Sequence, residues 1–168
     1  VKTKGGHSAA PWLSENAVEK AFELWEALKN LKLPEGRTPF HSVTSYLTEI
    51  RGGEASSTIP SECMIRINFR IPPTLNSTTL LGRILSAIDS YRRENQKVSV
   101  EAEVEDVVEP VEVDRNSPVV KALVWAIRSV VGGQVTLLRK TGSGDMNIFA
   151  KAVRIPVATY GPGDSTLD

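Results

Sequence analysis

The chain has 168 residues and carries 20 Lys and Arg against 20 Asp and Glu, so its formal net charge at pH 7 is zero. A protein whose main partner is nucleic acid or an anionic membrane needs an excess of basic charge, and the balance argues against both partners. Hydrophobic residues make up 40% of the chain, which suits a packed core and is too many for a disordered polymer. No apolar run approaches the length of a membrane span.

The single cysteine, Cys63, cannot form an internal disulfide, and no cysteine cluster offers a thiolate metal site. We therefore expect a reducing, cytoplasmic setting. The sequence begins at Val1 without a signal peptide and stops at Asp168, close behind a Gly/Pro-rich run. Natural domains seldom start on a strand and stop within a loop, so we expect both ends to lie inside a longer polypeptide.

The first part of the chain predicts a strand, a loop and a helix. Residues 1–6 are typical of the end of a strand, and a Gly-Gly-His-Ser loop follows. A helix is expected over 15–29, with Ser14 as its N-cap. Its buried stripe has helical spacing and comprises Ala17, Ala21, Leu24 and Leu28.

Two strands come next. Residues 41–50 predict a strand, and residues 61–71 predict the clearest one, because apolar and polar side chains alternate along it. Met64 is the single apolar residue on its polar face. Pro72-Pro73 ends the strand, since proline has no N–H to donate to a neighbour.

A second helix over 78–92 and a strand over 97–105 complete this part. The buried stripe of the helix is expected to comprise Leu81, Ile84, Leu85, Ile88 and Tyr91. The strand should place Val98, Val100, Ala102 and Val104 on its buried side. Strands with one solvated face favour an antiparallel or mixed sheet that carries both helices on its other face. We predict an α/β (α+β) fold, a ferredoxin-like two-layer sandwich over residues 1–112.

The pattern changes after Pro110. The expected elements are a helix that starts at Ser117-Pro118 and ends at Gly132-Gly133, a strand over 134–139, a short helix, and a strand over 155–160. Such a strand–helix–strand piece makes a poor core alone. We therefore expect residues 113–168 to be the incomplete edge of a larger α/β domain.

Two single residues are candidates for chemistry. His7 can be a solvated loop histidine, or an imidazole aimed at a carbonyl oxygen that gains charge during attack. The glycines beside it would allow the backbone to approach closely. Arg70 ends the alternating strand on its polar face. It can be an ordinary exposed charge, or a guanidinium fork that holds a substrate carboxylate, with its base stiffened by Pro72-Pro73.

The run Gly142, Ser143, Gly144 and Asp145 lies between an expected strand and a helix. Backbone N–H groups at such a helix start bind anions. The alternative is a tight turn with Asp145 as N-cap, and a phosphate loop is excluded because no Gly-Lys-Ser/Thr follows. The run Gly161-Pro162-Gly163-Asp164 follows another expected strand, where open α/β sheets place their ligands.

Some kinds of site have no support in the sequence. His7 and His41 are the only histidines, and no His, Cys or carboxylate spacing resembles a complete metal site. A Gly-x-Ser-x-Gly nucleophile motif is missing as well. The residues therefore suggest no metal site and no serine nucleophile.

Four segments, in this order, resemble one family: the co-catalytic zinc deacylases and carboxypeptidases, which include acetylornithine deacetylase and succinyl-diaminopimelate desuccinylase. The resemblance is nearest to hydrolases that release lysine or ornithine from an amino-group carrier protein or an acetyl cap. The segments are Gly5–Pro11, Asn68–Pro73, Gly142–Asn147 and Tyr160–Asp164.

The resemblance implies a homodimer in which a dimerisation domain is inserted into a catalytic domain. This chain would cover the insert and the last catalytic segment. By the same resemblance, His7 reaches into the partner's active site and supports the oxyanion, Arg70 grips the substrate's α-carboxylate, and Gly142 to Asp145 shape the pocket. The substrate would be a small N-acyl amino acid or a carrier-protein-linked one.

The resemblance also implies two zinc or cobalt ions in the complete enzyme. The family's metal ligands would precede Val1 or follow Asp168 directly, so we assign none to this chain. Ser56-Ser57 stand where relatives often carry asparagine, which argues against a polar substrate contact there. The alternative functions are a catalytically inert dimerisation module and a small-molecule-binding regulatory domain.

Overall fold

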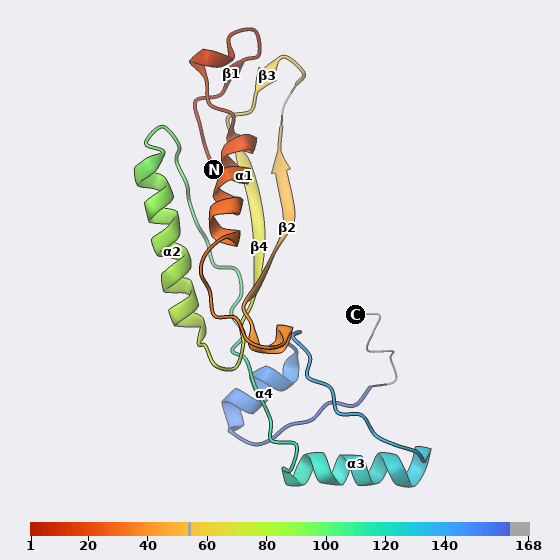
Figure 1. The fold of residues 1–168 in the computed structure, drawn as a ribbon. Coiled ribbons are helices and arrows are strands. Elements are labelled where there is room, and N and C mark those ends of the chain that lie inside the picture. The colour runs from red at the N-terminus through yellow and green to blue at the C-terminus, as the bar shows by residue number, and fades with distance from the viewer. Residues whose placement is uncertain (54, 162–168) are drawn as a thin grey trace. The chain divides into compact units, whose positions relative to one another are not determined.

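The computed structural model describes residues 1–53 and 55–161 (Figure 1). The chain divides into two compact units, Val1–Val107 and Val108–Asp168, which we treat separately. The sequence pattern predicts a boundary slightly later, between residues 112 and 113. None of the described helices combines the length and the apolar run that a bilayer crossing requires.

The sheet of the first unit is built on two long antiparallel strands, β2 (Thr44–Gly52) and β4 (Cys63–Arg70). They pair from Thr44 opposite Arg70 to Gly52 opposite Cys63, with a bulge between Leu47 and Glu49. Burial along β4 alternates residue by residue, as its sequence predicts. Both expected strands are confirmed.

Backbone hydrogen bonds add two short segments to this sheet. The N–H of Cys63 donates to the Val1 carbonyl over 2.9 Å. Lys2 and Ser99 exchange two bonds of 2.7 and 2.9 Å, in antiparallel register. The order across the sheet is therefore β2, β4, residues 1–3 and residues 98–100. With a helix on each crossover, this order is the ferredoxin-like arrangement that the sequence predicts.

The last strand is shorter than expected. Val98 and Val100 are buried, whereas Val104 is 49% exposed. In the register that pairs Lys2 with Ser99, Val100 comes opposite Val1, so residues 101–105 find no pairing partner in the described part of the chain. A strand needs a neighbour for its N–H and C=O groups, and the ladder therefore ends.

Two helices, α1 (Ala17–Lys29) and α2 (Ser77–Glu94), pack on one face of the sheet (Figure 1). The main core comprises Leu24, Leu28, Ile88, Tyr91, Val98 and Val100. The predicted stripe of α1 is confirmed, since all four residues are at most 4% exposed. For α2 the stripe is rotated: Leu80 is buried and Leu85 is exposed. Leu80 shares a face with Ile84, Ile88 and Tyr91, and Leu85 lies about 100° from its centre.

The helix starts differ from one expectation. Asn16, not Ser14, caps α1, and its side-chain oxygen accepts a 2.9 Å bond from the N–H of Val18. Asn76 caps α2 in the same way through the N–H of Thr79. Short 3-10 turns, η1 (Pro11–Leu13) and η2 (Pro39–His41), lie in the connections.

The second unit contains α3 (Pro118–Val131) and α4 (Asp145–Val153). The predicted start and end of α3 are confirmed, with Gly132 at φ 76° after its last turn. Residues 134–139 and 155–160 form no strands in the described part of the chain, because no paired neighbour lies beside them. Little of this unit is buried, and Trp125 on α3 is 72% exposed.

Tyr91 links the two helices of the first unit. Its hydroxyl donates to the Lys20 carbonyl over 2.9 Å and lies 3.4 Å from a Glu23 carboxylate oxygen. Burial, and secondarily the Glu23 charge, raise the pKa of the Tyr91 hydroxyl above its ordinary value. The Tyr91 hydroxyl therefore loses its proton at a lower pH in the unfolded chain than in the folded chain. The contribution of the protonated Tyr91 hydroxyl to the free energy of unfolding is complete below about pH 10 and decreases as the pH rises further.

We expect Tyr91→Phe to lower the free energy of unfolding by about 1 kcal/mol at neutral pH, because a buried hydrogen bond is lost. The variant should also lose less stability than the wild type between about pH 9 and 11. Urea titrations at several pH values measure both effects. The control is Tyr160→Phe, a tyrosine that is 61% exposed. Parallel pH profiles for wild type and Tyr91→Phe would contradict the assignment.

Candidate functional site

His7 lies in a small two-stranded sheet at one end of the first unit (Figure 1). Strand β1 (Gly6–His7) pairs antiparallel with β3 (Thr58–Ile59), which sets His7 opposite Thr58. The N–H of Ser8 extends the pairing with a 2.9 Å bond to the Ser57 carbonyl. The loop that holds the imidazole is therefore tied to a second loop of the same unit.

Gly5 before this histidine is required by the geometry. Its φ is +58°, and a Cβ there would lie 2.8 Å from the Ser61 Cβ and 2.9 Å from the Ile59 carbonyl oxygen. Glycine adopts such a φ without penalty, and only glycine leaves room for this approach. Gly5 thus allows the loop to lie directly against the neighbouring segment of Ile59 and Ser61.

The His7 imidazole is exposed and has one of its nitrogens occupied. Nδ1 accepts a hydrogen bond from the N–H of Ala9 over 3.1 Å. A neutral ring whose Nδ1 accepts must carry its proton on Nε2. The outward nitrogen is therefore a hydrogen-bond donor, which is the form needed to stabilise a developing oxyanion.

Arg70 ends β4 opposite Thr44 and is half-buried. The ring of Pro72, just beyond it, is fully buried and holds the strand end in place. No carboxylate of the described residues forms an ion pair with its guanidinium, whereas Arg66, on the same face, contacts both Glu49 and Glu105. Of these two arginines, Arg70 is the one available for an external anion.

His7 and Arg70 lie at opposite ends of the first unit. The small sheet of β1 and β3 is beyond the Cys63 end of β4, and Arg70 is at the other end (Figure 1). With 8 residues, β4 alone spans roughly 23 Å at about 3.3 Å per residue. The structure therefore does not bring the two candidates together within one chain.

The run from Gly142 to Asp145 is exposed in the second unit. Gly144 is the N-cap of α4, and Asp145 is in the first turn, so the expectation of Asp145 as N-cap is wrong. The Gly144 N–H donates to the Asn147 side chain over 3.1 Å, and that side chain donates to the Glu109 carbonyl over 3.2 Å. Residues 162–164 of the Gly/Pro run are outside the described residues.

Zinc and cobalt ions require a set of protein ligands that lie close together. Within residues 1–53 and 55–161, no group of three or more His, Cys, Asp or Glu side chains could hold a metal ion. Residues fitting a zinc or cobalt ion are thus not found in the described part. Burial raises the pKa of the Cys63 thiol, which opposes the thiolate form that binds metals.

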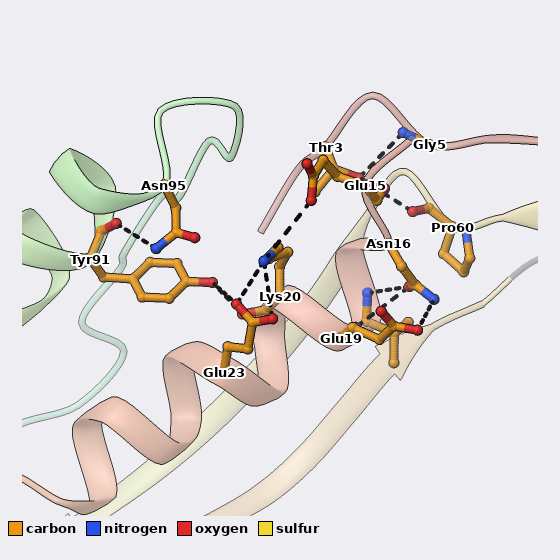
Figure 2. A network of polar contacts seen from close by, with 11 residues as sticks. Thr3, Gly5, Glu15, Asn16, Glu19, Lys20, Glu23, Pro60, Tyr91 and Asn95 are labelled. Carbon is orange, nitrogen blue, oxygen red and sulfur yellow. Dashed lines mark hydrogen bonds and ion pairs between the residues drawn. The ribbon is translucent and has the colours of Figure 1, made fainter. Parts of the chain in front are cut away.

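Thr3 is a further residue of interest, which the sequence pattern does not mark. Its hydroxyl donates to the Glu15 carbonyl over 2.6 Å and receives the N–H of Gly5 over 3.3 Å (Figure 2). No sequence signal marks this residue, since a threonine between two lysines is typical of an exposed strand.

Known proteins with similar sequences confirm the resemblance. Residues 1–96 match the family model of the peptidase dimerisation domain. A Pyrobaculum aerophilum protein assigned as a LysW-lysine/LysW-ornithine hydrolase is 30% identical over 167 residues, or 99% of this chain and 43% of its own. Succinyl-diaminopimelate desuccinylase of Marinobacter nauticus is 28% identical over the same shares. This chain thus spans less than half the length of these curated relatives.

A solved structure shows the same fold. The M20 family metallo-carboxypeptidase Sso-CP2 of Sulfolobus solfataricus superposes with a TM-score of 0.70 at 14% identity, covering 92% of this chain and 46% of that one. The family match covers more than half of the residues. The chain belongs to the M20 peptidase dimerisation domain family.

Proposed function

We propose that this chain is part of a metal-dependent amidohydrolase that removes an N-acyl or carrier-linked group from lysine or ornithine. Both relatives are named for reactions on an amino acid that carries two amino groups: lysine or ornithine in one case, diaminopimelate in the other. Residues 1–112 would serve as the dimerisation domain, and residues 113–168 as a segment of the catalytic domain.

The observation that carries the proposal is the state of the His7 ring. Hydrolysis of an amide passes through a tetrahedral intermediate whose oxygen is negative. A donor aimed at that oxygen stabilises the transition state more than the bound substrate. With Nδ1 engaged by the Ala9 N–H, the Nε2–H of His7 is fixed as such a donor.

Arg70 would bind the α-carboxylate of the substrate. A guanidinium donates two parallel hydrogen bonds to a carboxylate, which fixes both distance and orientation. The lack of an ionic partner among the described residues and the rigid end of β4 favour this role. The carboxylate is not altered in the reaction, so Arg70 contributes to binding more than to the chemical step.

The separation of the two residues supports a site shared between subunits. The α-carboxylate and the acylated nitrogen of one amino acid are a few bonds apart, whereas β4 alone spans roughly 23 Å. One substrate molecule can meet both side chains only if His7 comes from the partner subunit. We therefore place each active site between the two chains of a homodimer.

The outer edge of β2 is the surface that we propose for dimerisation. In the described chain β2 pairs only with β4, so its other edge is open to a second strand. Exposed apolar side chains lie on β2 and on α1, which packs against it: Tyr46, Ile50 and Phe22. A two-fold axis beside β2 would join two sheets and cover these side chains.

Other parts of the enzyme lie outside this chain in our proposal. Two zinc or cobalt ions would be held by residues not included here, since the described part offers no ligand cluster. Gly142, Ser143, Gly144 and Asp145 would line the substrate pocket beside them. The unpaired, buried Cys63 agrees with a cytoplasmic enzyme.

We expect His7→Ala in the complete enzyme to lower kcat by about 10²–10³-fold with little change in KM, because the donor acts in the transition state. Steady-state hydrolysis of N-acetyl-ornithine, N-succinyl-diaminopimelate and carrier-linked lysine measures the effect. His41→Ala replaces the other histidine of this chain and serves as control. An unchanged kcat for His7→Ala would remove the oxyanion role and favour an inert dimerisation module.

Arg70→Ala should raise KM at least about tenfold on the same substrates, because a charge-assisted bidentate contact to the carboxylate is lost. The matched control is Arg66→Ala, on the same face of β4 but already paired with Glu49 and Glu105. Equal KM values for the wild type and Arg70→Ala would show that the carboxylate binds elsewhere.

Mixed dimers test the shared site. A dimer with one His7→Ala chain and one Arg70→Ala chain keeps one site with both wild-type side chains if His7 acts across the interface. We expect such a dimer, purified through two different tags, to recover about half of the wild-type activity, and each homodimeric variant to stay impaired. Failure to recover activity would place both residues in the same chain's site or outside it.

A further inference from the structure

We propose that Thr3 is a positioning residue for His7, because its hydroxyl closes the base of the loop that carries the imidazole. This inference rests on the oxyanion role proposed for His7. Thr3 itself would touch neither the substrate nor the reacting atoms.

The hydroxyl of Thr3 contacts three separate segments (Figure 2). It donates to the Glu15 carbonyl over 2.6 Å, just before α1, and accepts the N–H of Gly5 over 3.3 Å. It also lies 3.4 Å from the Pro60 carbonyl, in the connection between β3 and β4. The Thr3 side chain thus contacts both ends of the loop of residues 4–14 and the segment at Pro60.

These contacts hold both ends of residues 4–14 together. Thr3 precedes the loop and Glu15 follows it, so the bond between them closes the loop at its base. The backbone adds a 2.8 Å bond from the Thr3 N–H to the Ser61 carbonyl, and a 2.9 Å bond from the Ala17 N–H to Pro60. Pro60 and Ser61 directly follow β3, and β3 pairs with the strand that contains His7.

The tip of the loop has few other restraints. The pairing of β1 with β3 involves two residues on each strand and is extended by the bond from the Ser8 N–H to the Ser57 carbonyl, and a ladder of that length is weak alone. The bond from Ala9 to the His7 ring is local and exposed. The order of the tip therefore depends on the base, and the Thr3 hydroxyl is the side-chain bond that closes it.

Without the Thr3 hydroxyl bond, the two ends of the loop would be less firmly joined and the His7 side chain would sample more positions. Small errors in the position of a catalytic group raise the barrier, while a contact made only in the transition state leaves substrate binding alone. Loss of the Thr3 hydroxyl should therefore reduce kcat through His7 and leave KM unchanged.

The test uses the complete, metal-loaded dimeric enzyme with N-acetyl-ornithine, N-succinyl-diaminopimelate and carrier-linked lysine. We expect Thr3→Val to lower kcat about five- to tenfold, as for the loss of one hydrogen bond, without changing KM. Thr3→Ser keeps the hydroxyl and should restore most of the rate. In the His7→Ala background, Thr3→Val should cause no further loss.

The matched control is Thr48→Val, which removes a hydroxyl bonded to the Arg66 carbonyl over 3.2 Å, away from the loop. It should leave kcat unchanged. If the Thr3→Val chain does not form a folded dimer, Thr3→Ala removes the same hydroxyl without adding a methyl group against the Glu15 carbonyl. Melting curves and light scattering verify fold and dimer for each variant.

The outcomes separate this inference from the function that it rests on. If His7→Ala lowers kcat but Thr3→Val does not, only the positioning role is wrong. If Thr3→Val costs as much in the His7→Ala background as in the wild type, Thr3 acts on the fold and not through His7, which also overturns the inference. If His7→Ala itself leaves kcat unchanged, the oxyanion role is wrong and the positioning role is lost with it.

Discussion

The pairing of three N-terminal residues between two other segments holds the first unit together. Val1 bonds to Cys63 on one side, and Lys2 bonds to Ser99 on the other. A central strand in this position joins elements that are distant in sequence. It also sets where the chain leaves the sheet, and Thr3 is the last residue of this pairing. The loop with His7 begins at that point, so the sheet sets the position from which the loop places the imidazole.

The same sheet keeps the two candidate residues apart. Strand β4 begins near the small sheet that carries His7 and ends at Arg70, at the opposite end of the unit. A small substrate cannot bridge this length within one chain. In our proposal this geometry makes catalysis depend on dimerisation, because only a second chain completes the site.

Charge pairing on the outer face of the sheet distinguishes otherwise similar residues. Arg66 and Arg70 lie four residues apart on β4 and point to the same side of the strand. Glu49 and Glu105 reach Arg66, so its charge is used within the unit. Arg70 lies at the strand end, beyond the reach of these two carboxylates. Arg66 is thus paired and Arg70 is available to an external anion because of carboxylates that are distant in sequence.

Local patterns in the sequence determined the elements whose cause is local. The alternation along β4, the stripe of α1, the Pro118 start and the Gly132 end of α3 follow from periodicity and backbone preference, and all are found. Residue type and a family resemblance point to His7 and Arg70, whereas nothing in the sequence marks Thr3, because its partners are backbone groups. Only the tertiary structure decided the cap at Asn16 and the rotation of α2. Each of these depends on which distant residue occupies the neighbouring position, and a single sequence does not contain that information in local form.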